Sequence, residues 1–348
     1  MTPEDLSERL AAFLARAHGA RSARIERLRL LTGGASRQTW SFDAEVERAD
    51  GRVESLALVL RADPRVSPGQ MSRETEYRLL EAAGAEGVPV PRVHLMGGDS
   101  LEMPFFLMER VEGETIPRRL LRDDEYAVAR RAMTGQLGAI LAQIHRVDVE
   151  RHGLDALLPA PPPDRSPAAG EVDKFKQVYR AITPEPHPAF ELAFRWLRAH
   201  LPPADASPRT LVHGDYRIGN VMFGPEGARA ILDWELAHLG DPMEDLGWLC
   251  VRSWRFGSDD LPVGGIGARE EFWSAYEAAG GGSVDAERVR FWEAFGNLRW
   301  GVICIGQAKA YLDRPDAGAA GPQLELASIG RRIAETEWEL LQLMDGSP

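Results

Sequence analysis

The 348-residue sequence predicts an α+β fold with a small antiparallel sheet in its N-terminal part and a larger, mainly helical C-terminal part. Residues 24–31, 37–47 and 55–61 have the alternation of strands, and Ala49-Asp50-Gly51 supplies turn chemistry between the last two. A long pattern of apolar residues at helical spacing over residues 123–147 then begins the second part. Strands followed by helices indicate an α+β arrangement of two lobes.

The remaining elements follow in order along the chain. Thr2, Pro3 and Asp5 are typical of a helix start. A helix over 70–83 and two short strands near 91–96 and 104–110 complete the N-lobe, which we bound at 1–111, with the C-lobe at 112–348. In the C-lobe we expect an exposed loop at 158–169, helices at 172–182 and 187–200, and short strands around the central motif at 210–235. The remainder, 236–348, is expected to be mainly helical.

Composition excludes several classes of protein. The net charge of −12 argues against a general nucleic-acid binder, which needs a cationic surface. No apolar run approaches the roughly 18 residues of a membrane-spanning helix, and the first residues lack the basic and apolar regions of a signal peptide. Two cysteines, Cys250 and Cys304, are too few for a disulfide framework. We therefore expect a cytoplasmic protein with no nucleic-acid or membrane partner.

The segment with the most chemical information spans residues 211–235. It reads LVHGDYRIGNVMF and, after a turn, AILDWE. Phosphoryl transfer needs a carboxylate to orient the attacking hydroxyl and oxygen ligands to hold magnesium. Asp215 can be that carboxylate, Asn220 lies five residues later on the same loop, and Asp233 ends the next short strand. An Asp-to-Asn separation of five with a second Asp downstream is the spacing of a kinase catalytic loop.

These residue types are also compatible with two alternatives to phosphoryl transfer. A His-Gly-Asp tripeptide alone is common turn chemistry, because glycine permits the turn and aspartate caps it. His213, Asp215 and Asp233 are also residue types of a metal-dependent hydrolase centre, although the other histidines show no ligand spacing. The joint occurrence of the two aspartates and Asn220 favours phosphoryl transfer.

The strings HGDYRIGN and ILDWE resemble the paired motifs of the aminoglycoside phosphotransferase and choline kinase superfamily. The longer string DWELAHLGDP at 233–242 is similar to a subgroup that includes the kinase-like domain fused to some acyl-CoA dehydrogenases. This resemblance covers nearly the whole chain. It implies a protein-kinase-like bilobal fold that binds ATP, or another nucleoside triphosphate, and Mg²⁺ between the lobes. The C-lobe would supply the catalytic loop at 213–220 and the metal-binding segment at 231–235.

The resemblance also implies roles for individual residues. Asp215 would be the catalytic base, and Asn220 and Asp233 would be the magnesium ligands. His213 would hold the catalytic loop without taking part in the chemistry. Asp245 would support the loop from behind, although capping of the next helix explains it equally well.

In the N-lobe, the resemblance implies a phosphate-binding turn and a phosphate-binding cation. Gly33, Gly34 and Ser36 lie between two expected strands, where backbone amides can surround phosphate oxygens. Arg61 ends the third strand, where the family often has lysine. A guanidinium can bind phosphate with two hydrogen bonds, so we expect Arg61 to replace that lysine. A pseudokinase acting as a nucleotide sensor is the alternative that this substitution leaves open.

Further nucleotide contacts follow from the same resemblance. Glu74 matches the glutamate that pairs with the strand-end cation, while Glu76 is expected on the exposed side of the helix. The carbonyl of Glu109 and the amide of Val111 would contact adenine at the hinge between lobes.

The acceptor is predicted only as a small molecule with a hydroxyl group. Residues 241–348 hold 18 acidic and 10 basic side chains, which permits a cationic amino sugar but equally fits acidic solvated helices. Six of nine tryptophans lie between 234 and 300, mostly as core, with one or two available to line an acceptor pocket. His145 is expected in the core or at the helix C-cap, and His238 either approaches the substrate or is a loop residue. The subgroup resemblance favours a hydroxylated metabolite, such as a hydroxyacyl thioester, over an aminoglycoside.

Overall fold

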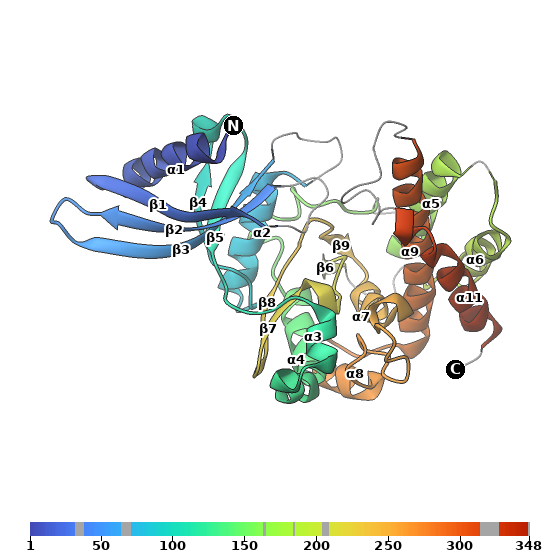
Figure 1. The fold of residues 1–348 in the computed structure, drawn as a ribbon. Helices are drawn as coiled ribbons and strands as arrows, with labels where there is room; N and C mark the ends of the chain where they lie inside the picture. Colours follow the sequence, from blue (N-terminus) through green and yellow to red (C-terminus); the bar gives the residue numbers. More distant parts are fainter. Residues whose placement is uncertain are drawn as a thin grey trace.

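The computed structural model of the chain has a sheet-containing lobe and a helical lobe (Figure 1), which confirms the predicted α+β arrangement. The described residues are 1–31, 38–63, 71–162, 165–183, 185–203, 209–313 and 327–346. The boundary between lobes at residues 111 and 112 stays a prediction.

The N-lobe contains one antiparallel sheet of five strands in the order β1-β2-β3-β5-β4. The strands are β1 (Ser22–Leu30), β2 (Gln38–Glu47), β3 (Val53–Ala62), β4 (Val93–Gly97) and β5 (Phe105–Glu109). Asp50 and Gly51 form the β2–β3 turn as predicted, with Gly51 at φ +82° and the Asp50 carboxylate accepting the Arg52 N–H. The third strand, β3, is central, so its end at Arg61 lies inside the lobe.

The two faces of this sheet are covered by different helices. Side chains alternate along β5, so Phe105 and Leu107 pack with α1 (Pro3–Ala17), while Phe106 packs with α2 (Arg73–Ala85). Thr2 caps α1 through the predicted start signal, with a reciprocal hydrogen bond to Asp5. The buried side of α2 belongs to the same apolar cluster as the C-lobe helices. This helix therefore joins the sheet to the second lobe.

The C-lobe is built around the long helix α9, which packs against α7 and α11. Its helices are α3 (Pro117–Arg122), α4 (Ala127–His145), α5 (Pro167–Ile182), α6 (Pro188–Ala199), α7 (Met243–Cys250), α8 (Arg269–Ala278), α9 (Ala286–Leu312) and α11 (Arg332–Asp345). The expected loop at 158–169 ends earlier than predicted, because Ser166 caps α5 and Pro167 occupies its first turn.

Two short antiparallel pairs of strands hold the motif segment on this lobe. They are β6 (Thr210–Val212) with β9 (His238–Gly240), and β7 (Val221–Gly224) with β8 (Gly227–Ile231). Because β6 ends at Val212 and β8 ends at Ile231, the two halves of the motif emerge from neighbouring strand ends.

The lobes are joined by more than the connecting chain. The N–H of Ile231 donates to the carbonyl of Pro89 over 2.8 Å, and Glu86 at the end of α2 contacts His152 of the C-lobe over 2.9 Å. In the connection itself, a Cβ on Gly113 would lie 2.8 Å from the carbonyl oxygen of Phe223, so only glycine fits. None of the helices in the described ranges is long and apolar enough to cross a membrane.

Candidate active site

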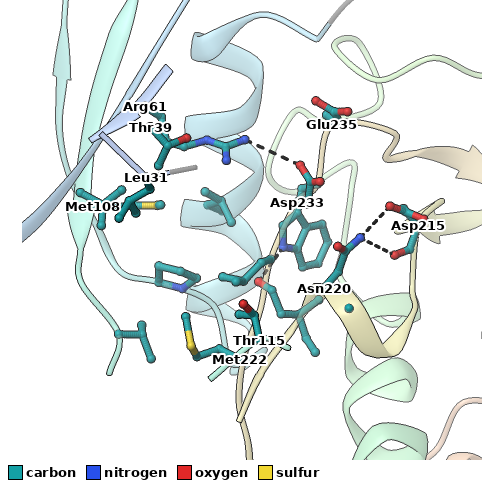
Figure 2. Close-up of a pocket in the computed structure, with 18 of the residues that line it drawn as sticks. Leu31, Thr39, Arg61, Met108, Thr115, Asp215, Asn220, Met222, Asp233 and Glu235 are labelled. Carbon is teal, nitrogen blue, oxygen red and sulfur yellow. Dashed lines mark hydrogen bonds and ion pairs between the residues drawn. The ribbon is translucent and has the colours of Figure 1, made fainter. Parts of the chain in front are cut away.

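A cleft of about 770 Å³ is lined by residues of both lobes and contains the motif side chains. Apolar groups such as Met108 line it on the sheet side. Figure 2 shows Arg61 and Met108 on one side of Asp233 and Asp215 on the other. Three tryptophans line the part of the cleft next to Asp215: Trp248, Trp254 and Trp300.

The predicted catalytic loop, residues 213–220, is anchored on its buried side by Asp245, a fully buried residue in the first turn of α7. Its carboxylate accepts the backbone N–H groups of His213 at 2.7 Å and Gly214 at 2.9 Å. Burial alone would raise the pKa of Asp245, but the hydrogen bond and charge of His145 and the loop N–H groups lower it below its usual value. Asp245 therefore supports the loop as an anion.

His213 links the two halves of the motif without facing the cleft. Its Nε2 donates to the carbonyl of Leu232 over 3.1 Å, because a carbonyl can only accept. Its Nδ1 then accepts the backbone N–H of Asp215 over 3.2 Å. Burial lowers the pKa of His213, which keeps this neutral tautomer in place.

Asp215 lines the cleft, and its carboxylate accepts hydrogen bonds from three side-chain donors. The indole Nε1 of Trp248 lies 2.8 Å from Oδ1, the Nε of Arg217 lies 3.1 Å from Oδ1, and the Nδ2 of Asn220 lies 2.7 Å from Oδ2. These bonds fix the carboxylate plane. Gly214 is needed beside it, because its φ is +76° and a Cβ there would lie 2.4 Å from the carbonyl oxygen of Leu236.

Asn220 returns to Asp215 through a single 3-10 turn, Ile218–Asn220. Its Nδ2 also donates to the backbone oxygen of Asp215 over 2.9 Å, so the amide oxygen is the atom that remains for a metal (Figure 2). Its backbone oxygen accepts the N–H of Leu232, which brings Asp233 to the same part of the cleft. Asp233 has φ +63°, a strained conformation for a residue other than glycine, and its carboxylate is partly exposed.

Arg61 forms its ion pair with Glu76, which corrects the predicted pairing with Glu74. Arg61 Nη2 lies 2.9 Å from Glu76 Oε1 and 3.8 Å from Asp233 Oδ1. Glu74 is exposed and pairs with Arg78 one turn further along α2, at 3.0 Å. The expected exposed position of Glu76 is also wrong, because Glu76 is only 3% exposed. It shares the buried face of α2 with Leu79, Leu80 and Ala83.

A buried network that the sequence did not predict braces this pair. Arg73, at the start of α2, is 1% exposed and ion-pairs with Glu76. Its Nε donates to Asp63, just beyond β3, over 2.8 Å. Two arginines and two carboxylates thus form a chain of ion pairs with alternating charge, from Arg61 through Glu76 and Arg73 to Asp63. Each buried charge therefore has a partner of opposite sign.

The other predicted nucleotide contacts are only partly visible. Glu109 and Val111 line the cleft at the connection between lobes. The backbone N–H of Glu109 donates to the carbonyl of Arg92, and the Glu109 carboxylate accepts the N–H of Arg92. The Glu109 side chain therefore points toward the start of strand β4. Gly33, Gly34 and Ser36 lie outside the described residues.

The histidines left open by the sequence have structural partners. His145 is buried, as expected, and its Nε2 contacts Asp245 over 3.2 Å while Nδ1 contacts the hydroxyl of Tyr276 over 2.9 Å. His238 lies on β9, where Nδ1 faces the carbonyl of Leu236 and Nε2 faces Glu244 at 3.2 Å. Burial opposes its protonation, but the Glu244 charge and hydrogen bond raise the pKa of His238 to about 9.

Asn220 and Asp233 offer hard oxygen donors at one place in the cleft, which fits Mg²⁺. Magnesium is commonly held by one or two protein oxygens together with water and substrate phosphates. Among the described residues, no group of three or more His, Cys, Asp or Glu side chains is arranged to hold a metal. A dinuclear hydrolase centre would need such a group, so the donor set fits a nucleotide-linked magnesium better.

Comparisons with known proteins bear on the family and the fold. The model of the phosphotransferase enzyme family matches residues 27–281. The chain is 31% identical over 303 residues to acyl-CoA dehydrogenase family member 10 of Mus musculus, covering 83% of this chain and 27% of that protein. The chain thus spans about a quarter of the length of that relative.

Two solved structures share the fold over nearly their full length. A Ralstonia eutropha protein provisionally named an aminoglycoside phosphotransferase is 26% identical, with a TM-score of 0.72 and 98% of each chain covered. Spectinomycin phosphotransferase in complex with ADP and spectinomycin is 16% identical, with a TM-score of 0.60, and the match covers 95% of this chain and 98% of that one. These matches confirm the family resemblance drawn from the motif segment.

Proposed function

The chain belongs to the phosphotransferase enzyme family, and we propose that it transfers the terminal phosphoryl group of Mg-ATP to a hydroxyl group of a small molecule. The observation that carries this proposal is the position of Asp215, between the charged groups Arg61 and Asp233 on one side and an aromatic wall on the other. A base in that position can reach a hydroxyl in the aromatic part of the cleft while the phosphates lie at the charged part.

In the proposed reaction, the acceptor oxygen forms a bond to the γ-phosphorus as the bond from that phosphorus to ADP breaks. The proton of the attacking hydroxyl passes to an oxygen of Asp215. Three donors hold the Asp215 carboxylate in one orientation before the acceptor arrives, which limits the reorganisation needed at the moment of transfer.

Asn220 and Asp233 would hold the magnesium, which supplies charge neutralisation on the phosphate oxygens. The strained backbone of Asp233 supports this role, because backbone strain of this kind gathers at functional sites. The hydrogen bond from Asn220 Nδ2 to Asp215 would orient the amide oxygen toward the metal.

Arg61 would bind the nucleotide phosphates in place of the lysine common in the family. Its Nε has no hydrogen-bond acceptor among the described side chains and backbone groups, although it is buried beside the cleft. A buried donor without a partner is unfavourable, so a phosphate oxygen would complete its hydrogen bonding. Glu76 and Arg73 would keep the guanidinium in place. Adenine would lie against Glu109 and Val111 at the connection between lobes, with the turn at Gly33, Gly34 and Ser36 over the phosphates.

For the acceptor we propose a hydroxylated metabolite, with a hydroxyacyl thioester as the leading candidate. The relative named as an acyl-CoA dehydrogenase supports an acyl acceptor, and the tryptophan-lined part of the cleft supports an apolar one. The neighbour solved with spectinomycin supports an aminoglycoside-like acceptor instead.

The test is to measure magnesium-dependent ATP consumption and phosphoryl transfer with a panel of hydroxyacyl thioesters, simple alcohols and aminoglycosides. Transfer to at least one acceptor, lost in Asp215→Ala and retained in Glu74→Ala, is the expected result. Nucleotide binding without turnover on every acceptor would contradict the enzyme and favour a nucleotide sensor. Phosphate-ester hydrolysis without ATP would favour a hydrolase.

A further inference from the structure

Arg217 lies next to the proposed base in a fixed orientation. Its Nε lies 3.1 Å and 3.2 Å from the two carboxylate oxygens of Asp215. The guanidinium carbon lies 5.0 Å from the ring centroid of Trp254, within the range of a cation–π contact. A Cβ on Gly219 would lie 2.4 Å from Nη1, so this glycine leaves the space that the guanidinium occupies. Asp215, Trp254 and Gly219 together thus define one position for the Arg217 guanidinium.

The terminal nitrogens of Arg217 remain available in that position. Within the described part of the chain, the hydrogen bonds and ion pair of Arg217 all involve Nε, and neither Nη1 nor Nη2 has an acceptor. Arg217 lines the cleft, and its side chain is 27% exposed. Up to four N–H groups therefore face a ligand or water beside Asp215.

The aromatic wall keeps this charge in a partly dry surrounding. Trp254 packs on Trp300 and Trp248 with ring centroids 4.9 Å and 5.3 Å apart, and both Trp248 and Trp254 are at most 5% exposed. A hydrogen bond from a guanidinium is stronger there than in open water. The charge of Asp215 is already paired with the Arg217 guanidinium, so a substrate ammonium group would not find an unpaired carboxylate there.

We propose that Nη1 and Nη2 of Arg217 bind a carbonyl or carboxylate oxygen of the acceptor, and that the acceptor is therefore a hydroxy acid or a hydroxyacyl compound. This inference rests on the proposed function, since it places the acceptor hydroxyl on Asp215. Arg217 is a residue that determines acceptor specificity at that site. Polycationic amino sugars would meet a fixed positive charge next to the base.

The spacing of the two groups sets the spacing of the two substrate oxygens. One oxygen hydrogen-bonds to an Asp215 carboxylate oxygen and the other to a terminal nitrogen of Arg217, each at roughly 2.8 Å. Since Arg217 Nε is itself 3.1 Å from that carboxylate, both substrate oxygens lie on the same small part of the cleft. A hydroxyl and a carbonyl separated by a few carbon atoms of an acyl chain meet this requirement.

The test compares two probes that differ only in the carbonyl group. They are the 3-hydroxybutyryl thioester of N-acetylcysteamine and its thioether analogue S-(3-hydroxybutyl)-N-acetylcysteamine, in which a methylene replaces the carbonyl, titrated calorimetrically into the full chain with and without Mg-ADP. Wild-type protein is expected to bind the thioester about 10- to 100-fold more tightly than the thioether, the value of a hydrogen bond to a charged group. In Arg217→Met this ratio should fall to about one. Arg118→Met, which removes an exposed arginine of α3, should keep the wild-type ratio.

The ratio separates acceptor recognition from damage to the base. Loss of the Arg217 contact to Asp215 affects the thioester and the thioether equally, so the ratio moves only if the carbonyl is recognised. Arg217→Lys keeps the charge but has only one terminal nitrogen, so it should give an intermediate ratio. This variant replaces Arg217→Met in the test if Arg217→Met does not fold.

Equal binding of the two probes to wild type, no binding of either, or an unchanged ratio in both Arg217 variants would overturn the assignment. Failure of the proposed function has a different signature. In that case ATP is not consumed with any acceptor, whether or not the thioester preference depends on Arg217.

Discussion

The proposed nucleotide end of the cleft, at Arg61 and Glu76, and its proposed acceptor end, at Arg217, Trp254 and Trp300, are built in different ways. The nucleotide end relies on buried charges from neighbouring elements, with Arg61 on β3 and Glu76 on α2 separated by 2.9 Å. The acceptor end combines Arg217 with aromatic side chains from distant segments, Trp254 after α7 and Trp300 on α9. Asp215 lies between them and has partners from the acceptor end.

This difference indicates which part of the site tolerates substitution and which does not. Paired charges have strict requirements for partner and distance, so single substitutions there leave a charge buried without compensation. Aromatic surfaces tolerate changes of shape with smaller losses of energy. We therefore expect changes at the nucleotide end to reduce stability and nucleotide binding, and changes at the acceptor end to change substrate preference.

The largest effect is expected for the residue shared by the two ends. Asp215→Ala should reduce transfer to every acceptor by about 10²- to 10⁴-fold, because the proton of the hydroxyl then has no positioned base. Nucleotide affinity, measured by calorimetry with Mg-ATP, should stay close to that of wild type. Glu74→Ala, which removes an exposed carboxylate that does not line the cleft, is the control and should keep wild-type transfer. Wild-type turnover in Asp215→Ala would show that the base is assigned to the wrong residue.

At the nucleotide end, Glu76→Ala should be strongly destabilising. It leaves Arg61 and Arg73 buried without that carboxylate, and removal of one partner of a buried ion pair typically costs about 3–5 kcal/mol. Urea unfolding gives the free energy of unfolding, and calorimetry gives nucleotide affinity, which should fall as well. Glu74→Ala should change the free energy of unfolding by less than about 0.5 kcal/mol, because Glu74 is exposed. If the two variants were equally destabilised, the buried network would not brace the nucleotide end.

Much of this site follows from the sequence because its residues are close together in the chain. Asp215, Asn220 and Asp233 lie within one loop and one strand end, and short spacing limits where they can point. Glu76 could also have been assigned from the sequence. Taken with Leu79, Leu80 and Ala83, it falls at helical spacing on the apolar face, whereas Glu74 is about 200° away around the helix.

The rest of the site depends on packing between distant elements. Asp245 and His145 meet across 100 residues, and neither position shows locally whether its side chain caps a helix or supports the loop. Trp254 and Trp300 become a wall only when α7 and α9 pack together. The contact of Arg217 with Asp215 is local, but its place over Trp254 is not. Sequence periodicity thus gives the faces of elements, while the acceptor end needs their tertiary arrangement.

The free energy of unfolding should depend on pH through His238 on β9. The ion pairs of the proposed nucleotide end should add no such dependence between pH 6 and 10. The raised pKa of about 9 means that His238 is protonated in the folded chain and stabilises it fully below its unfolded value near 6.5. That contribution, up to about 3 kcal/mol by the size of the shift, should be lost as pH rises toward 9. Urea unfolding of wild type and His238→Gln between pH 6 and 10 should show the two curves converging at high pH. Parallel curves would mean that the Glu244 contact does not depend on protonation.

The smallest effect is expected at the acceptor wall. Trp300→Ala removes one ring of the tilted aromatic pair with Trp254, and such a contact contributes about 0.5–1.5 kcal/mol. The KM for the acceptor should therefore rise by up to about tenfold, while the KM for ATP stays unchanged. Trp338→Ala, which removes a half-exposed tryptophan that packs on Arg252 outside the cleft, should alter neither value. A parallel rise in the KM for ATP would show that the two ends of the cleft are coupled, because the aromatic wall would then also hold the groups around Asp215 that meet the nucleotide.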